Sequence, residues 1–303
     1  MARKLMGGFR IPEFPYRADK DAPESLPANK RFEIKAGCME ECAFRGRSMR
    51  RPIVLTSPLI QPLQAKALAR KLEKSGEEGD YPLSLACAVF MALFRRRFIG
   101  ALWKLYAEQL LVCSPRTFTI VPRAWEFTPD ELLDVDSRRL KASLTTALYK
   151  MKAKDAGGWL IAFLHGEYDP VAGVFRLHVH GLASGQMIKV VERLRKLPQF
   201  KTRRLKSDGT PEAIYRPVRI RRKGLADLPA PLAYVAQSFW PSRAIYVDQD
   251  GKNRRQKTKR RIPEPYHSLV LLWLDRWHVD DLMLRIGLQV SNGDLVPTRR
   301  RGG

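Results

Sequence analysis

Apolar and polar residues alternate along Val174–Leu182, and this pattern carries the most information in the chain. A period of two is typical of a β-strand with one face on a hydrophobic core. The other face would then carry the polar side chains Arg176, His178 and His180. Two imidazoles two residues apart on one strand face have a spacing that suits one metal ion. The pattern therefore predicts a strand with a candidate metal-binding pair on an open face.

The neighbouring patterns predict a repeated order of strands and helices. The predicted elements are a strand over 116–121, a helix from Thr128 to about 152, a strand over 159–167, a turn over 168–173, the His-x-His strand, a helix from about 184 to 197, a basic strand over 213–220 and a short helix over 231–239. This order is the split βαβ arrangement of ferredoxin-like and RNA-recognition-type sheets. We therefore expect an α+β fold with an antiparallel sheet, helices on one sheet face and an open second face.

Outside this core the chain predicts accessory segments. Residues 1–50 are rich in Pro, Gly and charge and predict an extended basic arm. The expected division is that arm, a helical accessory region over 51–112 with helices over 58–74 and 82–111, the core over 113–247, and a last part over 248–303 with a basic loop over 248–261, a helix over 266–288 and a disordered tail.

Charge is the most unusual bulk property of the chain. Its 303 residues carry a formal net charge of +24. Like charges repel in a compact state, and a polyanion partner, above all nucleic acid, is the usual reason for such a balance. The chain has no uninterrupted apolar stretch of about 20 residues, so no membrane span is expected. The remaining alternative for the charge is a membrane surface.

Cysteine usage predicts a reducing cytoplasm. Cys87 and Cys113 lie in apolar surroundings and are expected to be buried thiols. Cys38 and Cys42 have C-x3-C spacing, which without a second Cys or His pair is only a weak indication of zinc.

A divalent ion on the His178–His180 pair would need a third protein ligand. Glu167, on the preceding strand, is the first candidate because a carboxylate suits Mg²⁺ or Mn²⁺, and His165 is the second. Antiparallel pairing brings them to the same face only in registers such as 165 opposite 178. The alternative is a solvated strand face with two ordinary histidines.

The strand Phe118–Val121, the His-x-His strand and a later Tyr in Leu232–Phe239 together resemble the three-motif layout of the HUH endonucleases. Within that superfamily the chain is most similar to bacterial plasmid rolling-circle replication initiators, over about residues 115–240. The resemblance implies an HUH endonuclease fold, a Mg²⁺ or Mn²⁺ cofactor, and site-specific nicking and joining of single-stranded DNA. It further implies single-stranded and duplex origin DNA as partners, a separate helicase and a bacterial cytoplasm.

The resemblance assigns the nucleophile to Tyr234, whose hydroxyl would form a 5′-phosphotyrosine link and release a 3′-OH. Replication proteins of this kind usually carry Lys three residues after this Tyr. Here the position is Gln237, and Arg243 is the nearest cation that could replace the Lys. Tyr246 is a second candidate nucleophile. The alternative for Tyr234 is a ring packed on the core.

Basic and aromatic side chains could hold DNA beside this centre. The candidate DNA-binding residues are Arg176, Arg219, Arg221, Lys223, Arg243, Arg254 and Arg255, and the basic run over 252–261 could clamp a duplex. Each run could instead be a solvated face. Phe239, Trp240, Trp273 and Trp277 could stack on bases, although core packing is favoured for the last two. Two other functions remain open: a non-catalytic single-stranded nucleic-acid-binding module, and a metal-dependent hydrolase that uses water.

Overall fold

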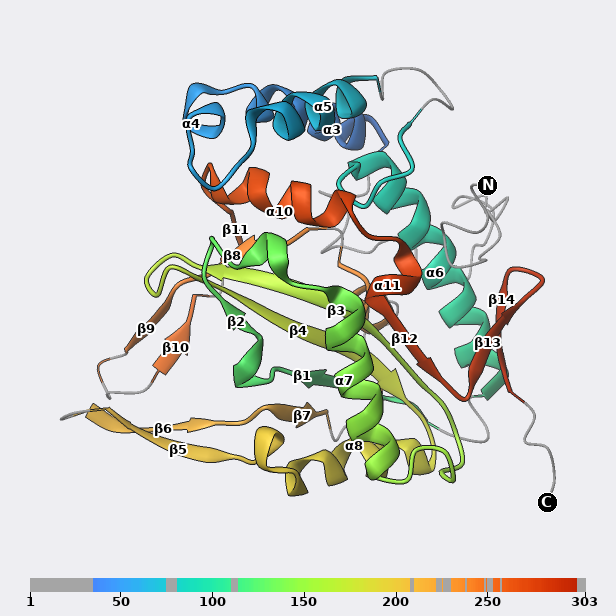
Figure 1. Cartoon of the computed structure of the whole chain (residues 1–303). Coiled ribbons are helices and arrows are strands. Elements are labelled where there is room, and N and C mark those ends of the chain that lie inside the picture. Colours follow the sequence, from blue (N-terminus) through green and yellow to red (C-terminus); the bar gives the residue numbers. More distant parts are fainter. Residues whose placement is uncertain are drawn as a thin grey trace.

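The computed structural model shows mixed helices and strands around one large, mostly antiparallel sheet (Figure 1). The structure describes residues 35–74, 81–109, 114–207, 210–221, 225, 230–237, 239–247, 249, 253–256 and 258–298. In these ranges no helix is long and apolar enough to cross a membrane. The α+β expectation is confirmed at this level.

The centre of the sheet is built from β1 (Arg116–Ile120), β3 (Leu160–Asp169), β4 (Val174–Ala183) and β7 (Val218–Ile220). Their order across the sheet is β3-β4-β1-β7, and every pair is antiparallel. Beyond β3 the sheet continues with β8 (Pro241–Ser242) and β11 (Arg260–Arg261), while β12 (Met283–Ile286) also pairs with β3 and β2 (Glu126–Phe127) pairs with β4.

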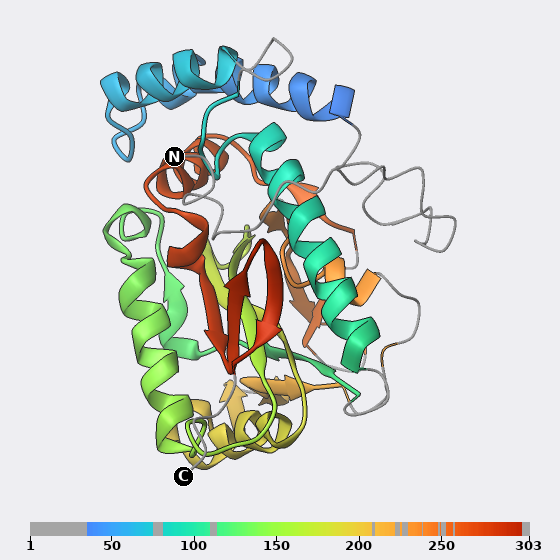
Figure 2. The same ribbon diagram turned by 90° about the vertical axis from the view of Figure 1, so that its right-hand side faces the viewer.

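Helices cover both faces of the sheet, so the expectation of an open second face is wrong over its centre. α7 (Ser137–Lys150) and α6 (Ala88–Gln109) lie on opposite sides of the strands (Figure 2). On the histidine side, the ring of Phe94 in α6 lies 5.7 Å from that of Phe163 in β3. Every residue of β3 is buried as a result.

The start of α7 differs from the prediction. Thr128 does not cap a helix, because Glu131 turns back and accepts a hydrogen bond from the Thr128 backbone N–H at 2.8 Å. The helix begins at Ser137, where the Asp136 carboxylate accepts from the backbone N–H of Arg138 at 2.8 Å. Thr128 and Asp136 are both residue types that commonly cap helices, and only Asp136 leads into an α-helix.

The N-terminal part of the described chain forms a helical layer above the sheet (Figure 1). It comprises α3 (Lys35–Met49), α4 (Pro52–Leu55) and α5 (Pro62–Glu73). The predicted extended arm is therefore wrong over 35–49, and residues 1–34 lie outside the described residues. Cys42 and Met49 are fully buried in this layer, so packing stabilises a helix that its local sequence does not predict.

The C-terminal part is less helical than predicted. α10 (Tyr266–Asp275) and the short α11 (Val279–Leu282) are followed by β12 and by a separate hairpin of β13 (Leu288–Ser291) and β14 (Asp294–Pro297). The predicted helix over 266–288 thus ends early, because Met283–Ile286 pair with the exposed edge of β3. The expected tail at 299–303 lies outside the described residues.

Two hairpins project from the sheet on the same side (Figure 1). One consists of β5 (Arg203–Ser207) and β6 (Thr210–Tyr215), and the other of β9 (Ile245–Val247) and β10 (Asn253–Arg255). α8 (Gln186–Arg193) precedes the first, and α9 (Ala230–Ala233) lies between them in sequence. The predicted loop over 248–261 therefore contains two short strands.

Glu41 joins the N-terminal layer to the edge of the sheet. Both of its carboxylate oxygens accept hydrogen bonds from Arg261 of β11, at 2.7 and 2.6 Å, and Arg45 donates to Oε1 at 2.8 Å. Burial raises the pKa of Glu41, but the Arg261 and Arg45 bonds and charges lower it more, to about 2. The N-terminal layer thereby holds β11 in place.

Glu41→Gln should therefore destabilise the protein in a pH-dependent way. The folded-state pKa lies below the usual value, so the carboxylate stabilises the fold above about pH 4.5, and the effect is lost as the pH falls toward 2. We expect a loss of about 2 kcal/mol at pH 7 and a much smaller loss near pH 3, measured by urea unfolding. Glu73→Gln, which breaks the exposed pair with Arg50, is the control and should cost less than about 1 kcal/mol. Equal losses for Glu41→Gln at both pH values would contradict the assignment.

Candidate nucleic-acid cleavage site

The register of β3 and β4 brings the predicted polar residues to one face. His165 pairs with His178, and Glu167 pairs with Arg176. Directly opposed residues of an antiparallel pair share a face. The condition for a shared face, a register such as 165 opposite 178, is thus met, and His165, Glu167, His178 and His180 lie on the same side of the sheet.

His178 and His180 form a close pair. Their Nε2 atoms are 3.0 Å apart, and both side chains are buried. The Nδ1–H of His178 donates to the backbone carbonyl of Arg176 at 3.1 Å, so the Nε2 of a neutral His178 carries a lone pair. The Nδ1 of His180 lies 2.9 Å from the hydroxyl of Thr119, which is directly opposite it on β1.

This arrangement accommodates two protonation patterns. When Thr119 donates to Nδ1 of His180, the Nε2–H of His180 donates to His178. When Thr119 accepts instead, both Nε2 lone pairs face the same point. Two nitrogens bound to one ion at about 2.1 Å with a near-right angle are about 3 Å apart, which is the separation seen here. In the second pattern the Thr119 hydroxyl would be the outer partner, that is, the group that hydrogen-bonds to a metal-binding imidazole and orients it.

Glu167 is the predicted third ligand, and it lines the same cavity as the histidine pair. Across the described residues, however, no group of three His, Cys, Asp or Glu side chains is arranged to hold one ion. The pair therefore fits a metal as two ligands, with Glu167 near enough to line the same space. Water or substrate would have to complete the coordination.

His165, the second candidate for this ligand, has a different role in the structure. Its Nε2–H donates to the backbone carbonyl of Val235 at 2.6 Å. Burial, with help from the neighbouring His178, lowers its pKa to about 3, so the ring is neutral at pH 7. The Nε2 of His165 is therefore bonded to a backbone carbonyl and is not available to an ion held by His178 and His180.

Tyr234 lies immediately after α9, in a turn and not within the helix predicted over 231–239. Its side chain is 42% exposed, whereas Leu232, Ala233, Val235 and Ala236 are at most 1% exposed. Its ring centroid lies 4.2 Å from that of His180. The alternative of a core-packed ring is therefore wrong, and the phenol is presented at the surface beside the imidazole pair.

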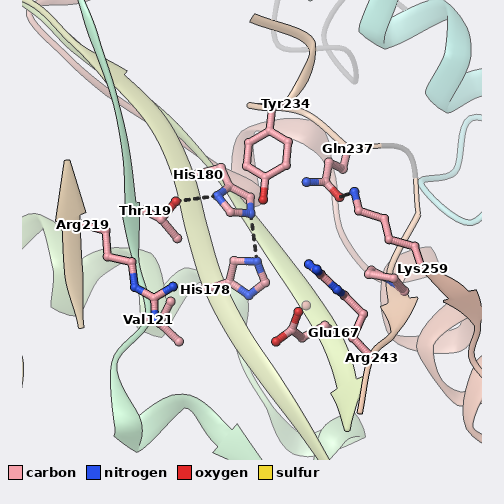
Figure 3. Close-up of a pocket in the computed structure, with 12 residues that line it drawn as sticks. Thr119, Val121, Glu167, His178, His180, Arg219, Tyr234, Gln237, Arg243 and Lys259 are labelled. Atoms are coloured by element: carbon pink, nitrogen blue, oxygen red, sulfur yellow. Dashed lines mark hydrogen bonds between the residues drawn. The ribbon is translucent and has the colours of Figure 1, made fainter. Parts of the chain in front are cut away.

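These groups surround a cavity of about 80 Å³ (Figure 3). The Tyr234 hydroxyl points toward the two imidazoles, and Glu167 lies on the other side of His178. Three cationic side chains, Arg219, Arg243 and Lys259, also line the cavity. A single water occupies about 10–15 Å³ of such a space, so the cavity has room for several waters or for one phosphate group.

Lys259 belongs to the basic run over 252–261, but the sequence did not indicate that it lies beside the histidine pair and Tyr234. Its Nζ donates to Oε1 of Gln237 at 3.2 Å and lies 5.6 Å from the Tyr234 ring centroid. Burial lowers its pKa, as do the charges of Arg243 and Arg95. The pairing of β11 with β8 places it there, and neither strand shows a clear signal in the sequence.

The predicted DNA-binding residues divide into distinct groups. Arg219 and Arg243 line the cavity, and Arg221 is exposed outside it. The prediction for Arg176 needs correction. Its side chain is bonded to Asp169 and, at 3.1 Å, to Glu126, so two carboxylates already neutralise its charge. Lys223 lies outside the described residues, and for Arg254 and Arg255 only the backbone of β10 is described.

The aromatic and cysteine candidates are mostly structural. Trp240, Trp273 and Trp277 are buried and form a chain of ring contacts, which confirms the core-packing expectation for the last two. The buried thiols of Cys42 and Cys87 have sulfurs 3.4 Å apart, so Cys42 faces Cys87. The Cys113 backbone and the side chain of Cys38 lie outside the described residues.

Comparison of the chain with protein-family models, with curated proteins and with solved structures finds no match. The geometry of the cavity and the chemistry of its lining are therefore the evidence for a function.

Proposed function

We propose that the protein is a metal-dependent endonuclease and strand transferase of the HUH type, which nicks and rejoins single-stranded DNA through Tyr234. The observation that carries the proposal is the exposed phenol of Tyr234 against the ring of His180, whose Nε2 is paired with that of His178. Initiation of rolling-circle replication, or of transfer of a mobile element, is the process that such chemistry serves.

The fold supports this assignment. The elements β1, α7, β3, β4, α8 and β7 follow one another in the order of a split βαβ unit. Their strands lie in the order β3-β4-β1-β7, with all neighbours antiparallel, as in a ferredoxin-like sheet. The His-x-His strand is central in that sheet, which favours a rigid placement of the two imidazoles.

His178 and His180 would hold a Mg²⁺ or Mn²⁺ ion, with Glu167 beside them. Such an ion polarises a phosphodiester oxygen and stabilises the charge that develops on phosphorus. The chain's contribution is the outer partners Thr119 and the Arg176 carbonyl, which orient the rings.

In the covalent step the Tyr234 oxygen attacks phosphorus and the bond from phosphorus to the 3′-oxygen breaks. The phenol loses its proton, and the departing 3′-oxygen gains one from solvent, so charge and atoms balance. The product is a 5′-phosphotyrosine link and a free 3′-OH. A free 3′-OH can later attack the link in the reverse sense, and the strand is rejoined without an external energy source.

The cations around the cavity support this step electrostatically. Arg219, Arg243 and Lys259 approach it from three different segments of the chain. Pre-positioned positive charge stabilises a phosphoryl transition state more than it stabilises the substrate. The Nζ of Lys259 lies 5.6 Å from the centroid of the phenol ring, and its charge would also favour the phenolate.

Two other functions fit this cavity less well. A non-catalytic module would bind single strands on an open sheet face, but α6 and the α9 segment cover this face. A hydrolase that uses water as its nucleophile would not need an exposed Tyr beside the His178–His180 pair. The proposal also includes single-stranded and duplex origin DNA, a separate helicase and a bacterial cytoplasm, and these parts rest on the resemblance to replication initiators.

The direct test is incubation of the full-length protein with single-stranded oligonucleotides and Mn²⁺, followed by denaturing electrophoresis. A pool of random or origin-derived sequences supplies the unknown target. A DNA adduct that survives denaturant and disappears with EDTA supports the proposal. Retarded complexes on native gels without any adduct would favour the binding module, and cleaved DNA without an adduct would favour hydrolysis by water.

Lys259→Gln should slow adduct formation by roughly 100-fold, because it removes a positive charge that lies beside the reacting phosphate and phenol. Arg260→Gln is the matched control, since it removes the same charge from an exposed neighbour in β11. Single-turnover rates at saturating oligonucleotide separate chemistry from binding. If both variants lose rate and affinity to the same small extent, Lys259 acts only through general attraction of DNA.

A further inference from the structure

The turn that carries Tyr234 is held by side chains from two distant segments. The backbone carbonyls of Ala233 and Ala236 accept hydrogen bonds from Arg95 of α6, the former at 3.3 Å. The carbonyl of Val235 accepts from His165 of β3 at 2.6 Å. Three carbonyls around the phenol-bearing residue are thus bound by two buried side chains.

Local structure alone would not hold this turn. α9 has only four residues, and the last carbonyls of a helix have no partners within it. A buried carbonyl without a partner is costly, so the chain needs donors at this place. Arg95 and His165 are 1% and 2% exposed and supply those donors from below the turn.

We infer that Arg95 and His165 are positioning residues that hold the Tyr234 turn over the histidine pair, so that the placement of the nucleophile depends on α6 and on β3. This inference rests on the proposed function for its catalytic consequence. Neither residue touches the reacting atoms. Their loss should misplace the phenol without removing it, and a misplacement of about 1 Å can cost roughly 100-fold in rate.

His165 allows a sharp comparison of two substitutions. His165→Gln places an N–H donor near the position of Nε2, whereas His165→Phe keeps a ring of similar shape without a donor. The first should retain the bond to Val235, and the second should lose it. A residue that ligated the metal would respond differently, because glutamine would not replace an imidazole ligand.

The first readout needs neither DNA nor metal. The chain has nine tyrosines, and 3-fluorotyrosine labelling of the full-length protein reports them by ¹⁹F NMR. Tyr234→Phe assigns the Tyr234 signal, which the adjacent His180 ring should shift. We expect His165→Gln to leave this signal in place and His165→Phe to move it toward that of exposed Tyr246.

The second readout is the single-turnover rate of adduct formation with Mn²⁺. We expect His165→Gln within about 3-fold of the parent and His165→Phe slower by roughly 100-fold, at unchanged oligonucleotide affinity. Arg95→Lys and Arg95→Met form a second pair with the same expected order. His267→Gln and Arg97→Met are controls, since they change a buried His bonded to Glu264 and a buried Arg beside Tyr81.

The results separate the possible failures. A folded His165→Phe protein with an unmoved Tyr234 signal and an unchanged rate overturns the inference. Loss of Mn²⁺ affinity in both His165 variants would also overturn it and make His165 a ligand. If His165→Phe does not fold, the Arg95→Lys and Arg95→Met pair decides. If the parent protein forms no adduct, the proposed function fails, while the ¹⁹F comparison still tests whether the turn is held.

Discussion

Tyr234→Phe should abolish the covalent protein–DNA adduct, with a loss of at least roughly 1,000-fold in single-turnover rate. The substitution removes only the hydroxyl, which is the attacking atom in the proposed step. The ring is kept, so its contact with His180 and the buried packing of the flanking residues should persist. We expect oligonucleotide affinity and the thermal unfolding midpoint to change little. Denaturing gels with end-labelled DNA and Mn²⁺ measure the adduct.

Tyr246→Phe is the matched control for this variant. Tyr246 is 49% exposed, close to the 42% of Tyr234, but it lies on the β9–β10 hairpin and does not line the cavity. It should form the adduct at the parent rate. An adduct that persists in Tyr234→Phe and disappears in Tyr246→Phe would transfer the nucleophile to the hairpin. DNA cleavage that is unchanged in Tyr234→Phe would indicate a hydrolase.

The central hairpin could be predicted from the sequence because its turn is encoded locally. The Asp169 carboxylate accepts from the backbone N–H of Val171 at 3.0 Å, and Gly173 adopts a φ of 67°. Such a turn sets the register, and the register sets the face of every side chain in β3 and β4. The grouping of His165, Glu167, His178 and His180 followed from that local chemistry.

The cover of the histidine face could not be predicted in the same way. Alternation along β4 indicates two different faces, but it does not indicate whether a distant helix lies on the polar one. In the structure α6 packs on the polar face of β4. Its Arg95 donates hydrogen bonds to the buried backbone carbonyls of the turn that carries Tyr234, and such carbonyls require partners. Arg95-Arg96-Arg97 in a helical pattern gave no indication of which of them faces inward.

Contacts between distant segments also account for the other differences. Lys259 enters the site because β11 is paired with β8 and because Arg261 is bound by Glu41 of α3. Arg176 is removed from the candidate DNA-binding residues because it is bonded to the carboxylates of Asp169 and Glu126. Charge patterns along one strand do not reveal such partners, whereas the hydrophobic period does reveal the strand itself.

The second large expected effect is the loss of Mn²⁺ binding when the His178–His180 pair is changed. His178→Ala and His180→Ala should each weaken Mn²⁺ binding by at least roughly 100-fold, because even the loss of an outer partner costs about 10–100-fold. Removing either ring leaves a single Nε2 where two lie 3.0 Å apart. Thr119→Val should give an intermediate loss of about 10-fold, since it removes only the hydroxyl that supports His180. Electron paramagnetic resonance of free Mn²⁺ measures each affinity without DNA.

The control is His278→Asn, which changes an exposed histidine and keeps a side chain that can cap α11. It should bind Mn²⁺ as the parent protein does. If all of these variants bind Mn²⁺ equally, the two imidazoles are an ordinary hydrogen-bonded pair, and Tyr234 has no metal beside it. If only the two alanine variants fail and Thr119→Val is normal, the pair binds the ion without its outer partner. The graded order, with Thr119→Val between the parent and the alanine variants, is the outcome that the bond from Thr119 to His180 requires.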